Sequence, residues 1–379
     1  MASRVFQTGS RATTALLAVS GLVVLSACSS NSSGTTANPS STGGTSDKVQ
    51  VGVILPDTTS SARYTQYDAP LLTKAFEAAG VKADIQNAQG DNAKFVSIAQ
   101  TMISEGVKVL LIDPADPATG ISVETSAKAA GIQVIDYDRV NLGGSAGYYV
   151  SFDNPSVGKL QAQGLLDCLK AGGKSSAAQV IMLNGGTDID NNAVQFKAGA
   201  HEVLDAAAKA GTIKIAQEID VSKWDNATAA TDFQQLLTRN GGKVDGVLAA
   251  NDGIGGAAIG ILKSKQLKIP VTGQDASIQG LQYVLTGDQC MTVFKDVSKE
   301  ADAASKLAIA LVKGDTAGAA ALASSTLKDT KGNRDIPYVS LVPTSITKAN
   351  VKDVVTAGAV TAAELCKGIA AACTAAGIS

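Results

Sequence analysis

The stretch VKVLLIDPADPATGISVETSAKAAGIQVIDYDRV, residues 107–140, decides the fold of this chain. A short apolar run (107–113) is followed by an amphipathic run (117–130) that stops at Gly131, and then by a second β-branched run (132–137). Short strands that alternate with helices ending at glycine are typical of β–α–β units. Right-handed crossovers between such units predict a parallel sheet covered by helices on both faces.

The same alternation extends in both directions from this stretch. Upstream we expect strands at 49–55 and 82–87 and helices at 62–79 and 93–105. A second series begins after residue 154, with helices at 155–170, 189–208, 227–239, 255–265 and 279–285 and strands at 178–183, 213–218, 244–249 and 269–273. Two series of similar size predict an α/β protein with two similar Rossmann-like lobes.

The N-terminal residues 1–27 have the features of an export signal. Arg4 and Arg11 flank an apolar run (15–25) that is shorter than the roughly 20 residues needed to span a membrane. Cys28 follows Leu-Ser-Ala, which resembles the bacterial lipobox; the alternative is an ordinary secretory signal with a chance cysteine. Residues 28–47 are rich in Ser, Thr, Gly and Asn and predict a flexible tether. We therefore expect a lipoprotein anchored through Cys28 on the extracytoplasmic face of the cell membrane.

Composition and cysteine count narrow the remaining classes. A formal net charge of −2 with mixed signs lacks the basic stripe of a nucleic-acid-binding protein, so we expect no nucleic-acid partner. Export leaves Cys168, Cys290, Cys366 and Cys373, which allow three pairings; we favour Cys366–Cys373 with Cys168–Cys290. The cysteines have no C-x-x-C spacing, and the single histidine is remote from them in sequence, so we expect no metal site.

Polar residues gather at the carboxyl ends of the predicted strands, where open α/β sheets bind their ligands. They are Asp57, Asp113, Asp136, Asp138, Arg139, Asn184, Asn251, Asp252 and Asp275. Asp57, Asp113 and Asp252 are equally well explained as helix caps or turn formers. Asp138 fits that explanation poorly because the arginine that follows it does nothing for a cap.

Seven motifs in order resemble the D-xylose-binding proteins of ABC importers, within the type I periplasmic sugar-binding proteins of the ribose/galactose class. They are VIDYDRV (134–140), YVSFDN (149–154), VGKLQ (157–161), NGGTDIDNNAVQF (184–196), ANDG (250–253), GQDA (273–276) and MTVFK (291–295). The resemblance implies two lobes joined by three hinge strands, near 150–154, 294–295 and 322–328. The N-terminal lobe would comprise 48–150 plus 296–322, and the C-terminal lobe 151–295 plus 323–379.

The resemblance also implies which residues contact the sugar. They are Arg63, Tyr64, Asp138, Arg139, Asp190, Asn192, Trp224, Asn251, Asp275 and Lys295. Tyr64 departs from the family, where we expect tryptophan. The set suits a sugar, because carboxylates accept from hydroxyls, Arg and Lys donate to them, and an indole face packs against C–H groups. The alternative for Trp224 is a half-buried core residue.

These features predict a solute-binding lipoprotein that captures a monosaccharide by hinge closure and passes it to an ABC permease, as a monomer without a cofactor. We favour D-xylose; another pentose, a hexose or a pentitol, or a role as sugar sensor for a membrane receptor, stays open. We expect no enzyme, since Leu55-Pro56-Asp57 stands where a dehydrogenase needs G-x-G-x-x-G. A helix-turn-helix repressor of the same fold would not begin with a lipobox.

Overall fold

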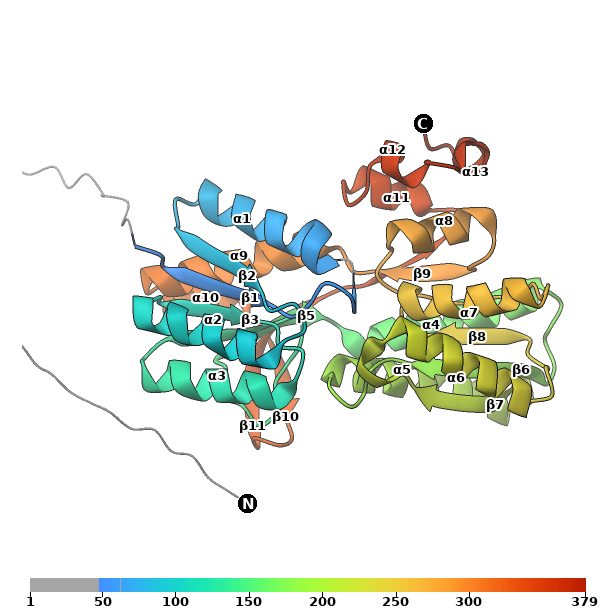
Figure 1. Ribbon diagram of the computed structural model, residues 1–379, viewed down its shortest axis with the longest axis horizontal. Helices are drawn as coiled ribbons and strands as arrows, with labels where there is room; N and C mark the ends of the chain where they lie inside the picture. Colours follow the sequence, from blue (N-terminus) through green and yellow to red (C-terminus); the bar gives the residue numbers. More distant parts are fainter. Residues whose placement is uncertain (1–47, 62) are drawn as a thin grey trace, which may run out of the picture. The chain divides into compact units, whose positions relative to one another are not determined.

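A seven-stranded sheet organises the first lobe in the computed structural model, which describes residues 48–61 and 63–379 (Figure 1). The predicted signal peptide (1–27), tether (28–47) and Cys28 lie outside these residues. The described residues belong to one compact unit. Within the described residues, no helix combines the length and apolar character needed to cross a membrane.

The first sheet has the strand order β10-β11-β5-β4-β3-β1-β2. Its strands are β1 (Val51–Leu55), β2 (Ala83–Asn87), β3 (Val109–Ile112), β4 (Gln133–Tyr137), β5 (Tyr148–Phe152), β10 (Ser325–Asp329) and β11 (Arg334–Leu341). All pair in parallel except β10 with β11. β1 and β3 are buried along their whole length, because helices cover both faces of the sheet.

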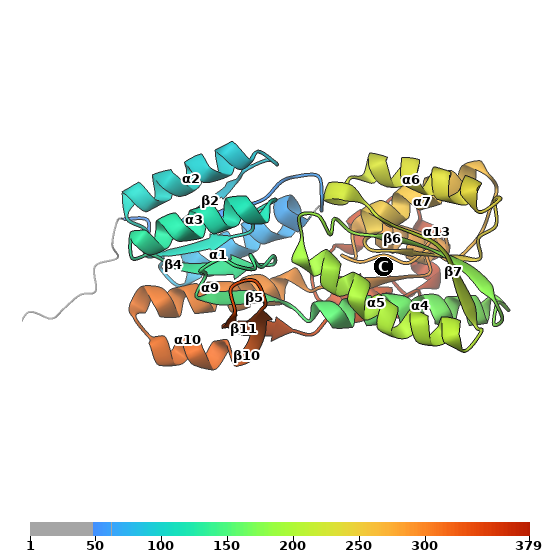
Figure 2. The same ribbon diagram turned by 90° about the horizontal axis from the view of Figure 1, so that it is seen from below.

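The helices divide between these two faces (Figure 2). On one face α1 (Ala69–Ala78), α9 (Val297–Lys313) and α10 (Thr316–Leu322) share an apolar cluster with Val53 of β1. On the other, α2 (Asn92–Glu105) and α3 (Pro117–Ala129) pack against its neighbour Ile54. Successive residues of a strand point to opposite faces, so one strand serves both cores.

The second lobe repeats this plan. Strands β7 (Ile213–Asp220), β6 (Ala178–Asn184) and β8 (Gly246–Ala249) form a parallel sheet in that order, between helices α4 (Asn154–Ala171) and α5 (Asn191–Lys209) on one face and α6 (Asn226–Arg239) and α7 (Asp252–Ser264) on the other. Single bridges continue the order through Val271 to β9 (Met291–Phe294), which pairs with β12 (Thr344–Thr347). Counted along the chain, the strands of the second lobe therefore lie in the order second, first, third, fourth, fifth. The first lobe has the same order in β2-β1-β3-β4-β5, which confirms the predicted fold class of two similar α/β lobes.

A small apolar cluster ends the chain. It joins α8 (Ile278–Thr286) to the short helices α11 (Val351–Thr356), α12 (Ala362–Leu365) and α13 (Ala370–Ala375). The disulfide Cys366–Cys373 lies in this cluster, and Cys168 of α4 is joined to Cys290 just before β9. The favoured cysteine pairing is therefore confirmed.

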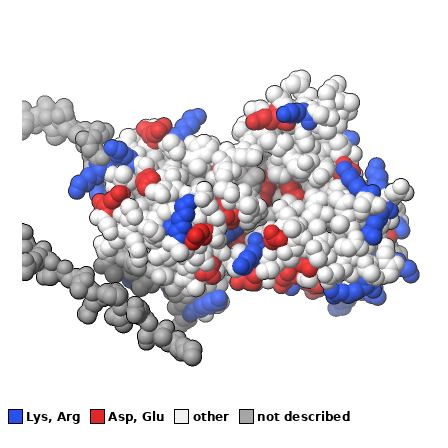
Figure 3. All heavy atoms as spheres, viewed as in Figure 1, with Lys and Arg blue, Asp and Glu red and all other residues white. Residues whose placement is uncertain are grey.

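On the face shown in Figure 3, positive and negative side chains are interspersed.

The chain passes between the lobes after β5, after β9 and between β11 and β12. The predicted third crossing near 322–328 is wrong, and so is the assignment of 325–341 to the second lobe. β11 pairs in parallel with β5, and Tyr338 stacks on Tyr149 with 4.7 Å between ring centroids. β10 is mostly exposed and β11 alternates buried and exposed residues, and neither pattern indicates which sheet a strand joins.

Candidate binding site

A pocket lies where the strand ends of the two lobes face each other. The structure brings together in its lining all ten residues that the sequence predicted: Arg63, Tyr64, Asp138, Arg139, Asp190, Asn192, Trp224, Asn251, Asp275 and Lys295. The lining also includes four residues that the sequence analysis missed, namely Ser60, Ser61, Phe196 and Gln274. The space left between these side chains is about 30 Å³, room for one or two water molecules.

Short loops and helix starts position these side chains. Asp138 and Arg139 directly follow β4, while Asp190 caps α5 by accepting from the Asn192 N–H. Asn251 caps α7 in the same way, and Lys295 directly follows β9. Placing the residues on the ends of rigid elements fixes their relative geometry.

Several pocket residues have a left-handed backbone conformation that residues other than glycine rarely adopt. The φ angles are +60° at Asp138, +59° at Trp224 and +99° at Asp275, and Lys223 and Ala276 beside them are also positive. Such conformations cost about 1–3 kcal/mol each and persist where the surroundings enforce them, characteristically at binding sites. Strained backbone conformations are therefore clustered at this pocket.

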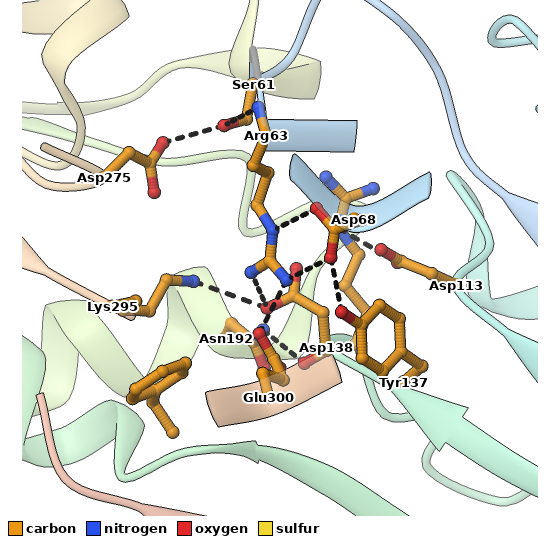
Figure 4. A network of polar contacts seen from close by, with 12 residues as sticks. Ser61, Arg63, Asp68, Asp113, Tyr137, Asp138, Asn192, Asp275, Lys295 and Glu300 are labelled. Carbon is orange, nitrogen blue, oxygen red and sulfur yellow. Dashed lines mark hydrogen bonds and ion pairs between the residues drawn. The ribbon is translucent and has the colours of Figure 1, made fainter. Parts of the chain in front are cut away.

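Arg63 is held by three buried acidic side chains (Figure 4). Its Nε and Nη2 donate to Asp68 at 2.9 and 2.7 Å, and Nη2 also donates to Glu300 at 2.6 Å. Nη1 donates to Asp138 at 2.9 Å. Four of the five guanidinium N–H groups are thus engaged, and one is left for a ligand. Arg63 is mainly a support that orients Asp138.

Asp138 is an ionised acceptor at the centre of the pocket. Burial alone would raise its pKa, but the charges of Arg63, Lys295 and Arg139 and the hydrogen bond from Tyr64 hold the pKa below the ordinary value. The Tyr64 hydroxyl donates to Asp138 at 2.9 Å, and Lys295 Nζ lies 3.4 Å from it. A carboxylate in this setting stays charged at neutral pH and accepts strong hydrogen bonds.

Arg139 is far less engaged than Arg63. Its Nη2 donates to Ser60 Oγ at 3.3 Å, and its Nε is 3.4 Å from Asp190 and 3.7 Å from Asp113. Its Nε and Nη1 have no hydrogen-bond acceptor among the described residues, although the side chain is buried. The guanidinium carbon lies 5.7 Å from the centre of the Tyr64 ring, within cation–π range. Arg139 is accordingly a buried donor with N–H groups that the described residues leave without an acceptor.

The second lobe contributes the aromatic wall. Trp224 Nε1 donates to Asp190 at 3.1 Å, and its ring meets Phe196 edge-on at 6.2 Å between centroids. Hydrogen bonds also join the lobes: Asn192 Nδ2 donates to the Asp138 carbonyl at 2.7 Å. Ser61 Oγ donates to Asp275 at 3.0 Å.

Donors, acceptors and an apolar ring thus surround one small space. That arrangement is suited to a compact ligand with several hydroxyls and apolar C–H faces. In the described part of the chain, no group of three or more His, Cys, Asp or Glu side chains is arranged to hold a metal ion.

The missed residues had partial signals in the sequence. Ser60 and Ser61 lie close before Arg63 in the sequence, and Gln274 precedes Asp275. Phe196 is four residues after Asn192 on α5, so helical spacing places both on one face. Glu300, which holds Arg63 together with Asp68, had no such signal, because it is distant in sequence and becomes a neighbour only when α9 packs on the first sheet.

Comparisons with known proteins identify the family of the chain. The model of the family described as periplasmic binding protein domain matches residues 51–316. The chain is 34% identical to the D-xylose-binding periplasmic protein of Escherichia coli (strain K12), over 81% of this chain and 89% of that protein. It is 34% identical to the multiple sugar-binding periplasmic receptor ChvE of Rhizobium radiobacter, over 82% and 90%. A carbohydrate transporter solute-binding protein from Chloroflexus aurantiacus in complex with D-glucose aligns with a TM-score of 0.74 and 28% identity, over 84% and 98%.

Proposed function

Since the chain belongs to the periplasmic binding proteins, in the type I sugar-binding class of the xylose and ribose proteins, we propose that it captures a monosaccharide, D-xylose first of all, for an ABC importer. The observation that carries this proposal is that two neighbouring residues offer an acceptor and a donor. Asp138 is an ionised acceptor fixed by Arg63 and Tyr64, and Arg139 is a buried donor with free N–H groups. Neighbouring sugar hydroxyls both donate and accept, so they use such a pair fully.

The proposed mechanism is hinge closure on the sugar. Arg139 and Asp138 belong to the first lobe, and Asp190, Trp224 and Asn251 to the second. A ligand that contacts both groups stabilises the closed form relative to the open one. Because only about 30 Å³ is free between the side chains, a sugar enters when the lobes part and is enclosed when they return. The closed form would then dock on the permease, and no chemical step is needed.

D-xylose is favoured by the 34% identity to the E. coli protein of that name. Another pentose, a hexose or a pentitol is the alternative, and the Chloroflexus neighbour holds D-glucose. A role as sugar sensor is a further alternative, since one relative is named a receptor. A missing hydroxyl partner discriminates between sugars much more strongly than space for one carbon does.

The test is isothermal titration of residues 45–379 with D-xylose, D-ribose, L-arabinose, D-glucose and xylitol. We expect saturable binding, tightest for D-xylose, that is lost in Arg139→Ala and Asp275→Ala while circular dichroism stays unchanged. Tightest binding of another sugar would reject xylose but keep the class. The absence of binding to all five would overturn the proposal.

We also propose that lipid on Cys28 anchors the mature protein to the outer face of the cell membrane. The support is the sequence Leu-Ser-Ala-Cys after a short apolar run and before a Ser/Gly-rich tether. Two acyl chains suffice for stable anchoring. Expressed in a bacterium fed radioactive palmitate, the wild-type chain should carry label and sediment with membranes, and Cys28→Ser should do neither. Label retained in Cys28→Ser would contradict the proposal.

A further inference from the structure

Arg139 lies between two carboxylates from different lobes. Asp113 directly follows β3 in the same lobe as Arg139, and Asp190 is the N-cap of α5 in the other lobe. The Arg139 Nε is 3.7 Å from Asp113 and 3.4 Å from Asp190, so both contacts are longer than a normal charge-assisted hydrogen bond of about 2.7–2.9 Å. The guanidinium is shared between the lobes and is fully bonded to neither.

Asp113 is left without hydrogen bonds in this arrangement. Its side chain is fully buried, and neither carboxylate oxygen accepts a hydrogen bond from the described residues; its contact with Arg139 is an ion pair at 3.7 Å. It is not part of the pocket lining, so it has no direct route to a ligand. A buried carboxylate without donors is costly, and the nearby cation that can relieve it is Arg139.

Separation of the lobes changes which carboxylate Arg139 can reach. Asp190 moves away with the second lobe, while Asp113 and Arg139 stay together on neighbouring strands of the first sheet. With the lobes apart, Arg139 can turn fully toward Asp113. Closure then draws the guanidinium back to Asp190 and leaves Asp113 underbonded.

From this geometry we propose that Asp113 is a positioning residue that holds Arg139 in its own lobe and opposes closure, in competition with Asp190. The inference rests on the proposed function, since it concerns the closure by which the sugar would be enclosed. Asp113 acts entirely through Arg139.

The electrostatics of the closed form agree with this role. Burial raises the pKa of Asp113, and the charges of Asp138 and Asp190 raise it further, while Arg139 and Arg63 lower it. Asp190 comes from the other lobe, so its repulsion of Asp113 exists only when the lobes are closed. Removing the charge at position 113 should therefore favour the closed form.

The experiment compares two isosteric variants on either side of Arg139, Asp113→Asn and Asp190→Asn. Nitroxide labels at Thr125→Cys on α3 and Thr231→Cys on α6, both exposed, report the lobe separation in sugar-free residues 45–379 by electron–electron double resonance. We expect Asp113→Asn to raise the closed population and Asp190→Asn to lower it. Because Asp113 does not line the pocket, Asp113→Asn should also bind the sugar more tightly, in proportion to its closed population.

Two variants that shift the populations in the same direction, or an Asp113→Asn variant that shifts nothing, would overturn the inference. A purely structural role for Asp113 would alter the urea midpoint of unfolding without opposite shifts in closure. If Asp113→Asn does not fold, Asp113→Leu, which is similar in size and uncharged, takes its place. Failure of the proposed function would give a different result: in the wild-type protein, none of the five sugars would change the distance between the labels.

Discussion

The indole ring of Trp224 lies directly against the backbone of Gly185. A Cβ added at position 185 would stand 2.1 Å from the ring carbon Cη2, which is closer than such atoms can approach. Gly185 follows β6, and Trp224 forms the aromatic wall of the pocket. The Trp224 ring can therefore take this position only because residue 185 has no side chain.

We expect Gly185→Ala to displace Trp224 and weaken sugar binding by about tenfold or more, the effect of losing about 1.4 kcal/mol of ring contact. Titration calorimetry measures the affinity. Gly260→Ala is the matched control, because a Cβ there meets nothing within 4 Å on an exposed position of α7. It should keep the affinity and gain about 0.5–1 kcal/mol of stability. Equal affinities in the two variants would refute the role of Gly185.

Arg63 and Arg139 should separate stability from binding. Arg63→Met leaves the Asp68 carboxylate buried without its cation, removes the donor to Glu300, and should cost about 3–5 kcal/mol in the free energy of unfolding. Arg139→Met should cost clearly less, because Arg139 makes no short hydrogen bond, yet it should abolish sugar binding. Urea unfolding and calorimetry on both variants test this. A loss of stability in Arg139→Met as large as in Arg63→Met would contradict it.

Glu300 should make the protein less stable as the pH rises. Burial raises the pKa of Glu300 to about 8, an effect that Arg63 partly offsets, whereas the ordinary value is 4.5. Between these values the folded state keeps a proton that the unfolded state has released. The free energy of unfolding therefore falls with rising pH, by up to about 1.4 kcal/mol per pH unit.

Glu300→Gln should flatten this dependence in urea unfolding measured from pH 5 to pH 8. A smaller slope should remain, because burial also raises the pKa of Asp252 to about 7. The control is Glu202→Gln, whose side chain is 61% exposed; it should leave the slope as in the wild type. An unchanged slope in Glu300→Gln would show that Glu300 is ionised throughout.

The two disulfides should contribute unequally. Cys168–Cys290 spans 122 residues and Cys366–Cys373 spans 7. Loop-closure entropy in the unfolded chain predicts that removing the first costs about 5 kcal/mol and removing the second about 2 kcal/mol. Double serine variants compared by urea unfolding test the order. A larger loss from the short loop would mean that local packing in the C-terminal cluster, not chain entropy, dominates.

Strand and helix periodicity identified both lobes, because each β–α–β unit has its hydrophobic pattern in consecutive residues. The pocket residues were predictable where they follow strands directly, as Asp138 and Arg139 do. Long-range contacts were not. Nothing near Glu300 indicates that it meets Arg63, and nothing in the alternating pattern of β11 indicates that it pairs with β5. Such contacts depend on how distant elements pack, which local sequence does not encode.

Trp224 gives the protein an optical property that follows from its place in the pocket. It is the only tryptophan in the chain, so light at the red edge of aromatic absorption excites this one ring. The ring is buried, bonded to Asp190 and set against Phe196. A sugar that enters beside it would change its surroundings, so its emission could report occupancy without an added dye. The protein as encoded is thus already the recognition element of a fluorescent sensor.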